Sequence, residues 1–310
     1  MREKILNAIG QDDFEKANEP MVEELTDEVK ADLDKLVVRP QDSTSNIDEC
    51  FYATNTFIDQ LYLKQDGNPL HGIPLGIQLG ITGLPSSGKS ILIEEIAVNS
   101  AGDGNRTLLV TSEDAFNTGT GRMDLAKRLR QKTQLLHQSW ENVTNNLVVL
   151  DTVTFSELRR WHTFARLYRH AIEANDIQLV LIDSVTLLET ARGALKNRLQ
   201  ELCRYNQLHG ITAIYVNQRA TEDWDKRGMA GGIVLGHIFD STLIIDYGSY
   251  WDDARIKADY EDYFGCPPKR KQELKIARVL GNRLGRFDAR YKFVRITDDG
   301  FLKLADNGKQ

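Results

Sequence analysis

One eight-residue segment has the residue types and spacing of a phosphate-binding loop. It follows the pattern GxxxxGK[ST] and consists of Gly83, Leu84, Pro85, Ser86, Ser87, Gly88, Lys89 and Ser90. Glycines let backbone N–H groups curl around phosphate oxygens, the lysine carries a positive charge to the β and γ phosphates, and the final hydroxyl is a ligand for Mg²⁺. A helix that starts at the loop directs its positive end at the anion. The segment therefore predicts a nucleoside triphosphate site, with Lys89 in a catalytic role.

An apolar segment that ends in a carboxylate supplies a second ligand for the cation. Residues 177–182 are mostly apolar and are followed by Asp183. In proteins with this kind of phosphate loop, an aspartate at such a strand end holds Mg²⁺ through its water shell. A carboxylate buried there without a partner is costly, so a metal or a hydroxyl must compensate it. We therefore predict that Ser90 and Asp183 hold magnesium.

Two further strand ends carry polar groups that can act at the γ-phosphate. The segment Thr107–Thr111, expected beside the strand of the phosphate loop, is followed by two acids. A carboxylate there can polarise a water against the γ-phosphate, and Glu113 is the first candidate, Asp114 the second. The alternative is that both acids cap the next helix. Ala213–Val216 leads to Gln218, whose neutral amide either senses the γ-phosphate or bonds only to a loop.

The elements that position these groups follow a regular order after about residue 75. The predicted strands are Ile77–Thr82, Thr107–Thr111, Leu147–Leu150, Leu179–Ile182, Ala213–Val216 and Thr242–Ile245. The predicted helices are Ser90–Ser100, Arg122–Gln134, Ser156–Ala174 and Leu195–His209. Short continuous apolar strands separated by helix-length segments indicate an α/β fold with a parallel sheet covered on both faces.

The two ends of the chain differ from this pattern. Glu273–Leu280 and Ala289–Thr297 are predicted to be strands, which would add an antiparallel edge to the sheet. Residues 1–40 have apolar positions at helical spacing, and a polar stretch with a proline follows at Arg39–Ser45. We therefore expect an acidic helical segment with its linker over residues 1–45 and one core domain over residues 46–310.

Composition excludes several classes of protein. The 310 residues are 41% hydrophobic and 27% charged, which is ordinary for a globular chain and unlike collagen, low-complexity or disulfide-scaffold sequences. No run approaches the roughly 20 apolar residues that span a bilayer, and the acidic start of the chain argues against a secretory signal. Three cysteines without a CxxC pair suggest no zinc framework and fit a reducing, cytoplasmic location.

Charge is divided unevenly along the chain, within a net charge of −6. Residues 1–40 hold six Lys or Arg against eleven Asp or Glu, whereas residues 265–295 hold ten Lys or Arg against two acids. Both stretches are compatible with solvated surfaces. The functional alternative is a basic surface that faces phosphate, or the acidic segment of a neighbouring copy.

Taken together, residues 54–303 resemble the RecA/RadA-type strand-exchange recombinases and their relatives, which include the KaiC-like ATPases. Besides the residues above, the likeness rests on Thr54–Asp59, Gly72–Gly76, Asp183–Thr186, Arg192–Leu195, Arg198, Asn217–Gln218, Gly231–His237 and Ile296–Phe301. The resemblance implies a RecA-like P-loop NTPase core with a twisted, mainly parallel sheet, and ATP hydrolysis with ATP and Mg²⁺ as cofactors. It also implies a homo-oligomer, either a filament or a ring, with ATP bound between subunits.

The resemblance assigns further residues. Glu113 takes the place of the catalytic glutamate and Gln218 that of the sensor, while Ile91 and Arg122 join the nucleotide contacts. Lys275 and Arg278 are similar in place to residues that such proteins present to the neighbour's phosphate, the alternative being two exposed cations on an edge strand. Single-stranded DNA contacts fall on Arg219, Trp224, Lys226 and Arg227. For Trp224 the alternative is packing against a neighbouring subunit.

Departures from the recombinase pattern keep three functions open. Residues 1–45 are acidic and lack the glycine-rich turns of the recombinases' N-terminal DNA-contacting module. The first DNA-facing loop, Leu187–Ala191, is short, and the second, Arg219–Ala230, has three basic and three acidic residues. A site for single-stranded DNA requires a positively charged groove with aromatic side chains on which bases stack. The first hypothesis is a DNA-binding recombinase or paralogue in DNA recombination and repair. The alternatives are a KaiC-like regulatory ATPase with a protein partner, or a ring helicase-type motor.

Overall fold

The computed structural model describes residues 51–119, 123–188, 194–218, 238–247, 253–267 and 274–306. The predicted acidic segment 1–45 lies outside them, so the division of the chain at residue 45 stays a prediction. The same holds for the predicted nucleotide contact Arg122 and for the predicted DNA contacts, which are Arg219, Trp224, Lys226 and Arg227.

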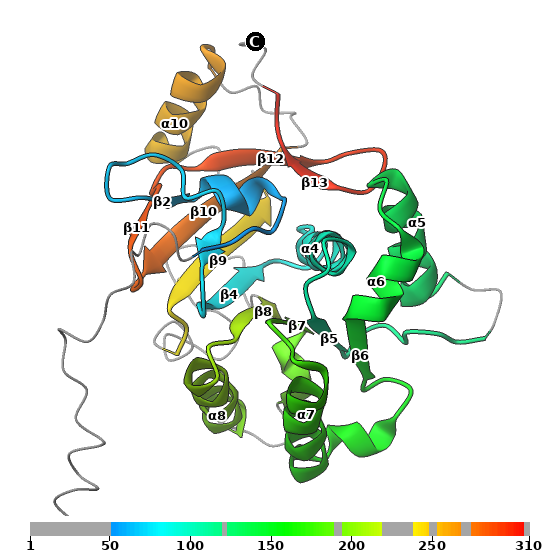
Figure 1. Ribbon diagram of the computed structural model, residues 1–310. Helices are drawn as coiled ribbons and strands as arrows, with labels where there is room; N and C mark the ends of the chain where they lie inside the picture. The colour runs from blue at the N-terminus through cyan, green and yellow to red at the C-terminus, as the bar shows by residue number, and fades with distance from the viewer. Residues whose placement is uncertain are drawn as a thin grey trace, which may run out of the picture. The chain divides into compact units, whose positions relative to one another are not determined.

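A nine-stranded sheet runs through the described core, in the order β13-β12-β10-β9-β4-β8-β7-β5-β6 (Figure 1). Its parallel part consists of β4 (Gln78–Gly83), β5 (Thr107–Thr111), β6 (Leu147–Asp151), β7 (Leu179–Asp183), β8 (Thr212–Gln218) and β9 (Ser241–Tyr247). Every neighbouring pair among these six strands is parallel. The predicted α/β fold with a mainly parallel sheet is thus confirmed.

The last part of the chain adds the predicted antiparallel edge. It is formed by β10 (Lys275–Asn282), β12 (Lys292–Ile296) and β13 (Leu302–Leu304), each antiparallel to its neighbour. Because β10 also pairs with β9, it is an inner strand. The reading of Lys275 and Arg278 as exposed cations on an edge strand is therefore wrong, and Lys275 is buried.

Two small sheets lie outside the large one. β1 (Phe51–Tyr52) pairs with β3 (Ile73–Pro74), and β2 (Tyr62–Leu63) pairs with β11 (Arg286–Phe287). A 3-10 turn, η3 (Phe57–Gln60), is capped by Thr56, whose side chain accepts from the Ile58 N–H. The β2–β11 pairing joins the segment before the phosphate loop to the late basic segment.

Helices cover both faces of the sheet, as Figure 1 shows. One face carries α4 (Lys89–Gly102), α5 (Leu125–Leu135) and α6 (Trp140–Asn146); the other carries α7 (Trp161–Asn175) and α8 (Ala194–Leu208). Side chains alternate along each strand, so that Leu109 and Leu181 join the first hydrophobic cluster while Leu108 and Val180 join the second. A third, aromatic cluster packs α10 (Ala254–Phe264) against β10 and β12.

Local capping explains where helices begin. α5 starts at Leu125 and not at the predicted residue 122, because the Asp124 side chain caps it by accepting from the Lys127 N–H at 3.1 Å. α7 starts at Trp161, after a separate 3-10 turn, η4 (Ser156–Arg159). The unpredicted helices α6 and α10 begin at the caps Ser139 and Asp253. None of the described helices combines the length and the apolar character needed to cross a membrane.

A buried polar network lies inside the second hydrophobic cluster. Asn206 Nδ2 donates to the Tyr215 hydroxyl at 2.8 Å and to Gln78 Oε1 at 3.3 Å, and its Oδ1 accepts from the Tyr168 hydroxyl at 2.9 Å. Tyr215 also donates to Gln78 Oε1 at 2.8 Å. All four side chains are fully buried. Because each polar group has a partner, the network specifies how α7 and α8 dock on the sheet.

Replacing Asn206 with alanine is expected to lower the free energy of unfolding by roughly 2–4 kcal/mol, because it leaves the buried Tyr168 hydroxyl without its acceptor. The matched control is Asn197→Ala, an exposed position on the same helix, which should change it by less than about 0.5 kcal/mol. Urea unfolding of the two variants checks this. Equal stability in both would contradict the role given to the network.

Candidate active site

The phosphate loop connects β4 directly to α4, and two of its glycines are required by geometry. A Cβ on Gly83 would lie 1.8 Å from the Ile245 carbonyl oxygen, so only glycine lets β4 lie this close to β9. Gly88 has φ +101°, which favours glycine, and a Cβ there would lie 3.2 Å from Leu302 Cδ1. Strand β13 thus supports the loop from behind. The first backbone N–H groups of α4 follow immediately, as the predicted phosphate site requires.

Lys89 is buried at the start of α4 and points back into its own loop. Its Nζ donates to the Gly83 carbonyl at 2.9 Å and to the Leu84 carbonyl at 2.7 Å. Burial lowers the pKa of Lys89, and the negative charges of Asp183, Glu113 and Asp246 oppose that shift. The ammonium group therefore lies in a poorly hydrated place near these carboxylates. The negative charge of a bound phosphate would stabilise its charged form further.

The residues at the predicted magnesium site suit that cation. Asp183 ends β7, and its Oδ1 is buried without a hydrogen-bond partner among the described residues. Burial raises the pKa of Asp183 to about 6, and Glu113 and Glu94 add to the rise, while a hydrogen bond to Ser90 and the Lys89 charge oppose it. A hydroxyl and one carboxylate are the few protein ligands that Mg²⁺ takes when it keeps several waters. Ser90 and Asp183 would hold it beside the phosphates.

Glu113 follows β5 and is held from two other strands. Its Oε1 accepts from Gln218 Nε2 at 2.9 Å and from the Ser184 hydroxyl at 3.0 Å. The main chain is fixed as well, since Ser112 N donates to the Asp183 carbonyl at 2.9 Å. The two predicted groups, base and sensor, are therefore in direct contact, although their strands are far apart in the chain.

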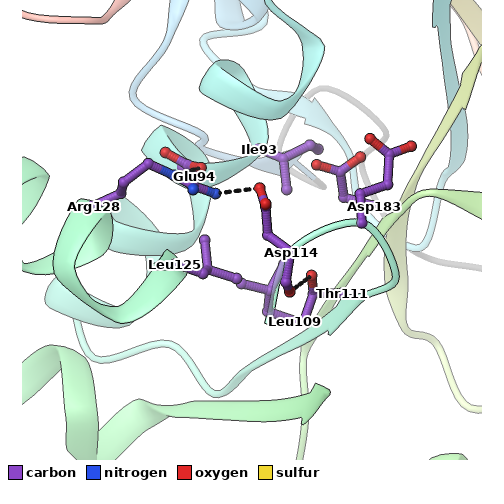
Figure 2. Close-up of a pocket in the computed structure, with 9 residues that line it drawn as sticks. Ile93, Glu94, Leu109, Thr111, Asp114, Leu125, Arg128 and Asp183 are labelled. Carbon is purple, nitrogen blue, oxygen red and sulfur yellow. Dashed lines mark hydrogen bonds and ion pairs between the residues drawn. The ribbon is translucent and has the colours of Figure 1, made fainter. Parts of the chain in front are cut away.

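Asp114 turns away from this contact. Its Oδ2 accepts from Arg128 Nη2 at 2.7 Å, while Arg128 Nε donates to Glu94 Oε1 at 2.8 Å. Figure 2 shows Arg128 of α5 pointing at Asp114 across the pocket that Glu113 and Asp183 also line. The arrangement ties the segment after β5 to α4 and α5. It distinguishes the two acids, because Asp114 forms an ion pair with Arg128, whereas Glu113 accepts hydrogen bonds from Gln218 and Ser184.

The strand order corrects one expectation. β5 does not lie beside β4, because β8 and β7 lie between them. The chain passes from β4 through α4 to β5, and the later strands β7 and β8 are inserted between those two. Four neighbouring strands, β4, β8, β7 and β5, therefore each bring one predicted group to the same edge of the sheet. Ligands of open α/β sheets bind at this carboxyl edge.

The remaining predicted residues lie apart from one another or outside the described residues. Ile91 is half-buried and packs on the first hydrophobic cluster. Arg278 is half-buried, with Nη1 donating to the Tyr291 hydroxyl at 3.3 Å and the guanidinium over that ring. Sequence reasoning missed the contacts of Ser184 and Arg128. Ser184 follows Asp183 directly, which was a usable signal, whereas nothing in the sequence connects Arg128 to Asp114.

These features are typical of P-loop ATPases: a phosphate loop, a strand-end aspartate, and a glutamate in contact with a glutamine, all on one mainly parallel sheet. Comparison with known proteins agrees: the family model described as "ATPase: KaiC" matches residues 43–301. The chain belongs to this family of KaiC ATPases.

Solved structures support the fold. A KaiC-like protein from the hyperthermophilic archaeon Pyrococcus horikoshii OT3 superimposes with a TM-score of 0.58 at 16% sequence identity. The match covers 83% of this chain and 99% of that one. No curated protein matches the sequence significantly. The RecA-like core is thus established, and the more specific kinship with RadA-type recombinases is not.

Proposed function

We propose that this protein hydrolyses ATP with Glu113 as the base and Gln218 as the group that reports on the γ-phosphate. The observation that carries the proposal is the hydrogen bond between these two side chains, at the strand edge that also holds Lys89 and Asp183. The carboxylate has two donors on Oε1, which orient it in a fixed direction.

The residues divide the work of one displacement. The N–H groups of the loop and Lys89 would bind the β and γ phosphates, and magnesium held by Ser90 and Asp183 would neutralise charge on their oxygens. Glu113 accepts a proton from water as that water attacks the γ-phosphorus. The bond from this phosphorus to the β–γ bridging oxygen breaks, and ADP and phosphate leave. Because Gln218 donates to the base, its position controls the direction in which Glu113 points.

An assembly of several copies would complete the site. Membership of the KaiC family supports a homo-oligomer, a ring or a filament, with ATP between subunits. Lys275 and Arg278 are the residues proposed to reach the neighbour's phosphate, as an arginine finger supplied in trans does. Arg278 is half-buried, whereas Lys275 is buried, so that assembly would have to expose the Lys275 side chain. The cytoplasmic location expected from the cysteines remains part of this proposal.

Two effectors are compatible with a sensor at Gln218, which directly precedes the segment of the predicted DNA contacts. The first is single-stranded DNA in recombination or repair, bound through Arg219, Trp224, Lys226 and Arg227. The second is a protein partner of a regulatory ATPase. Residues 219–230 contain three basic and three acidic residues. This balance favours the protein partner, because binding to the DNA backbone requires a segment with net positive charge.

Steady-state ATP hydrolysis with and without single-stranded DNA tests the proposal, with the Lys89→Ala protein as the blank. Magnesium-dependent hydrolysis above the blank is expected. If DNA acts at the predicted contacts, it raises the rate, the effect falls with salt, and reversing the charges of Lys226 and Arg227 removes it. A rate indifferent to DNA would overturn the DNA effector and favour the protein partner. No hydrolysis above the blank would overturn the enzymatic proposal.

A further inference from the structure

A chain of hydroxyl groups leads from Glu113 to the segment after β7. Ser184 Oγ donates to Glu113 Oε1 at 3.0 Å, and Ser184 Oγ and Thr186 Oγ1 are 2.5 Å apart. A serine hydroxyl has one hydrogen, and Ser184 donates it in the hydrogen bond to Glu113. The Thr186 hydroxyl is then the donor to Ser184. The resulting order is Thr186 to Ser184 to Glu113.

The serine in this chain is held rigidly. Ser184 is fully buried, and its N–H donates to Ser112 Oγ at 3.0 Å. Ser112 in turn donates its own N–H to the Asp183 carbonyl at 2.9 Å. Because the backbone at Ser184 is fixed to the residue before Glu113, the hydroxyl has one direction in which to donate. Thr186, in the 3-10 turn η5 (Val185–Leu188), is exposed.

We propose that Ser184 and Thr186 are positioning residues that orient Glu113 to accept the proton of the attacking water, with Thr186 acting through Ser184. This inference rests on the proposed function of Glu113. Gln218 donates to Oε1 from β8, and Ser184 donates to the same oxygen from the position that follows β7, so that two donors fix the direction of the carboxylate. A hydrogen bond to a charged group is stronger than a neutral one, and chains of such bonds reinforce each other.

The two hydroxyls therefore make coupled contributions. Ser184→Ala removes the donor and is expected to lower kcat about tenfold, with the KM for ATP unchanged, because neither hydroxyl lies among the residues assigned to ATP. Thr186→Val is expected to lower kcat about threefold, and Thr186→Ser to restore it. The double variant should equal Ser184→Ala alone, because Thr186 has no route to Glu113 once the serine hydroxyl is gone.

The experiment is steady-state ATP hydrolysis by the full chain and these four variants. Thr154→Val is the matched control, since it too removes an exposed threonine hydroxyl. Thr154 donates to the carboxylate of Asp151 at the end of β6, which has no role in the proposed site. Its rate should equal the parent rate. In a Glu113→Gln background, neither Ser184→Ala nor Thr186→Val should cause a further loss.

Additive losses in the double variant, or a raised KM with unchanged kcat, would overturn the inference while leaving the hydrolase proposal in place. Should Ser184→Ala fail to fold, the pair Thr186→Val and Thr186→Ser still decides, since that side chain is exposed. Equal rates in this pair would also overturn the inference. A parent protein without hydrolysis would instead overturn the proposed function, and this inference with it.

Discussion

Lys89→Ala is expected to reduce ATP hydrolysis about a hundredfold or more, below the detection limit of a steady-state assay. The reason is electrostatic: the lysine is the cation predicted at the β and γ phosphates, and it lies in a buried place where charge interactions are strong. ATP binding, measured by fluorescent-analogue titration, should also weaken. The assay is phosphate release under saturating ATP and magnesium.

The fold should survive this substitution. Burial lowers the pKa of Lys89, which means that the folded protein holds this charge at a cost. Removing it also removes the donor to the Gly83 and Leu84 carbonyls, so the free energy of unfolding should fall by no more than about 1–3 kcal/mol. Lys196→Ala, an exposed position on α8, is the matched control for losing a lysine and should keep full activity. Turnover retained by Lys89→Ala would remove the phosphate-loop assignment.

Glu113→Gln is expected to lower kcat by about 10²–10³ while the KM for ATP stays within a factor of two. The glutamine keeps an oxygen that can accept from Ser184 and Gln218, so the local structure is preserved. It loses the carboxylate that is proposed to take the proton from water. Single-turnover and steady-state hydrolysis, compared with ATP binding, separate this loss of chemistry from a loss of affinity.

Asp114→Asn is the matched control, because it neutralises the adjacent carboxylate. Asp114 is half-exposed and paired with Arg128, so its loss should cost less than tenfold in kcat. This comparison decides between the two acids that the sequence alone left as candidates. A larger loss in Asp114→Asn than in Glu113→Gln would show that the roles are reversed.

Local patterns in the sequence predicted most of the parallel sheet correctly. The predicted strand Thr107–Thr111 matches β5 at both ends, and the helix after the phosphate loop starts within one residue of the prediction. Continuous apolar runs and a loop motif are local signals, so they can be recognised without knowing which segments pack beside them. Helix starts were less accurate, as at α5, because the cap at Asp124 is one polar residue among several.

Pairing between distant segments could not be predicted in the same way. β5 was expected beside β4, but β8 and β7 come between them, because crossovers do not fix which neighbour a strand will take. β10 looked like an edge strand and is an inner one, which places Lys275 in a buried position. Which strands become neighbours depends on how the hydrophobic faces of the whole sheet and its helices pack together. No single segment of the sequence contains that information.

The sequence by itself determined the chemistry: a phosphate loop, a strand-end aspartate, a glutamate and a glutamine are recognisable from residue types and spacing. Only the tertiary structure decided that Glu113 contacts Gln218 and Ser184, while Asp114 is drawn to Arg128 and Glu94. The physical reason is that hydrogen bonds and ion pairs act over a few ångströms. Groups that are about a hundred residues apart in the chain meet only when the strands that carry them have been placed side by side.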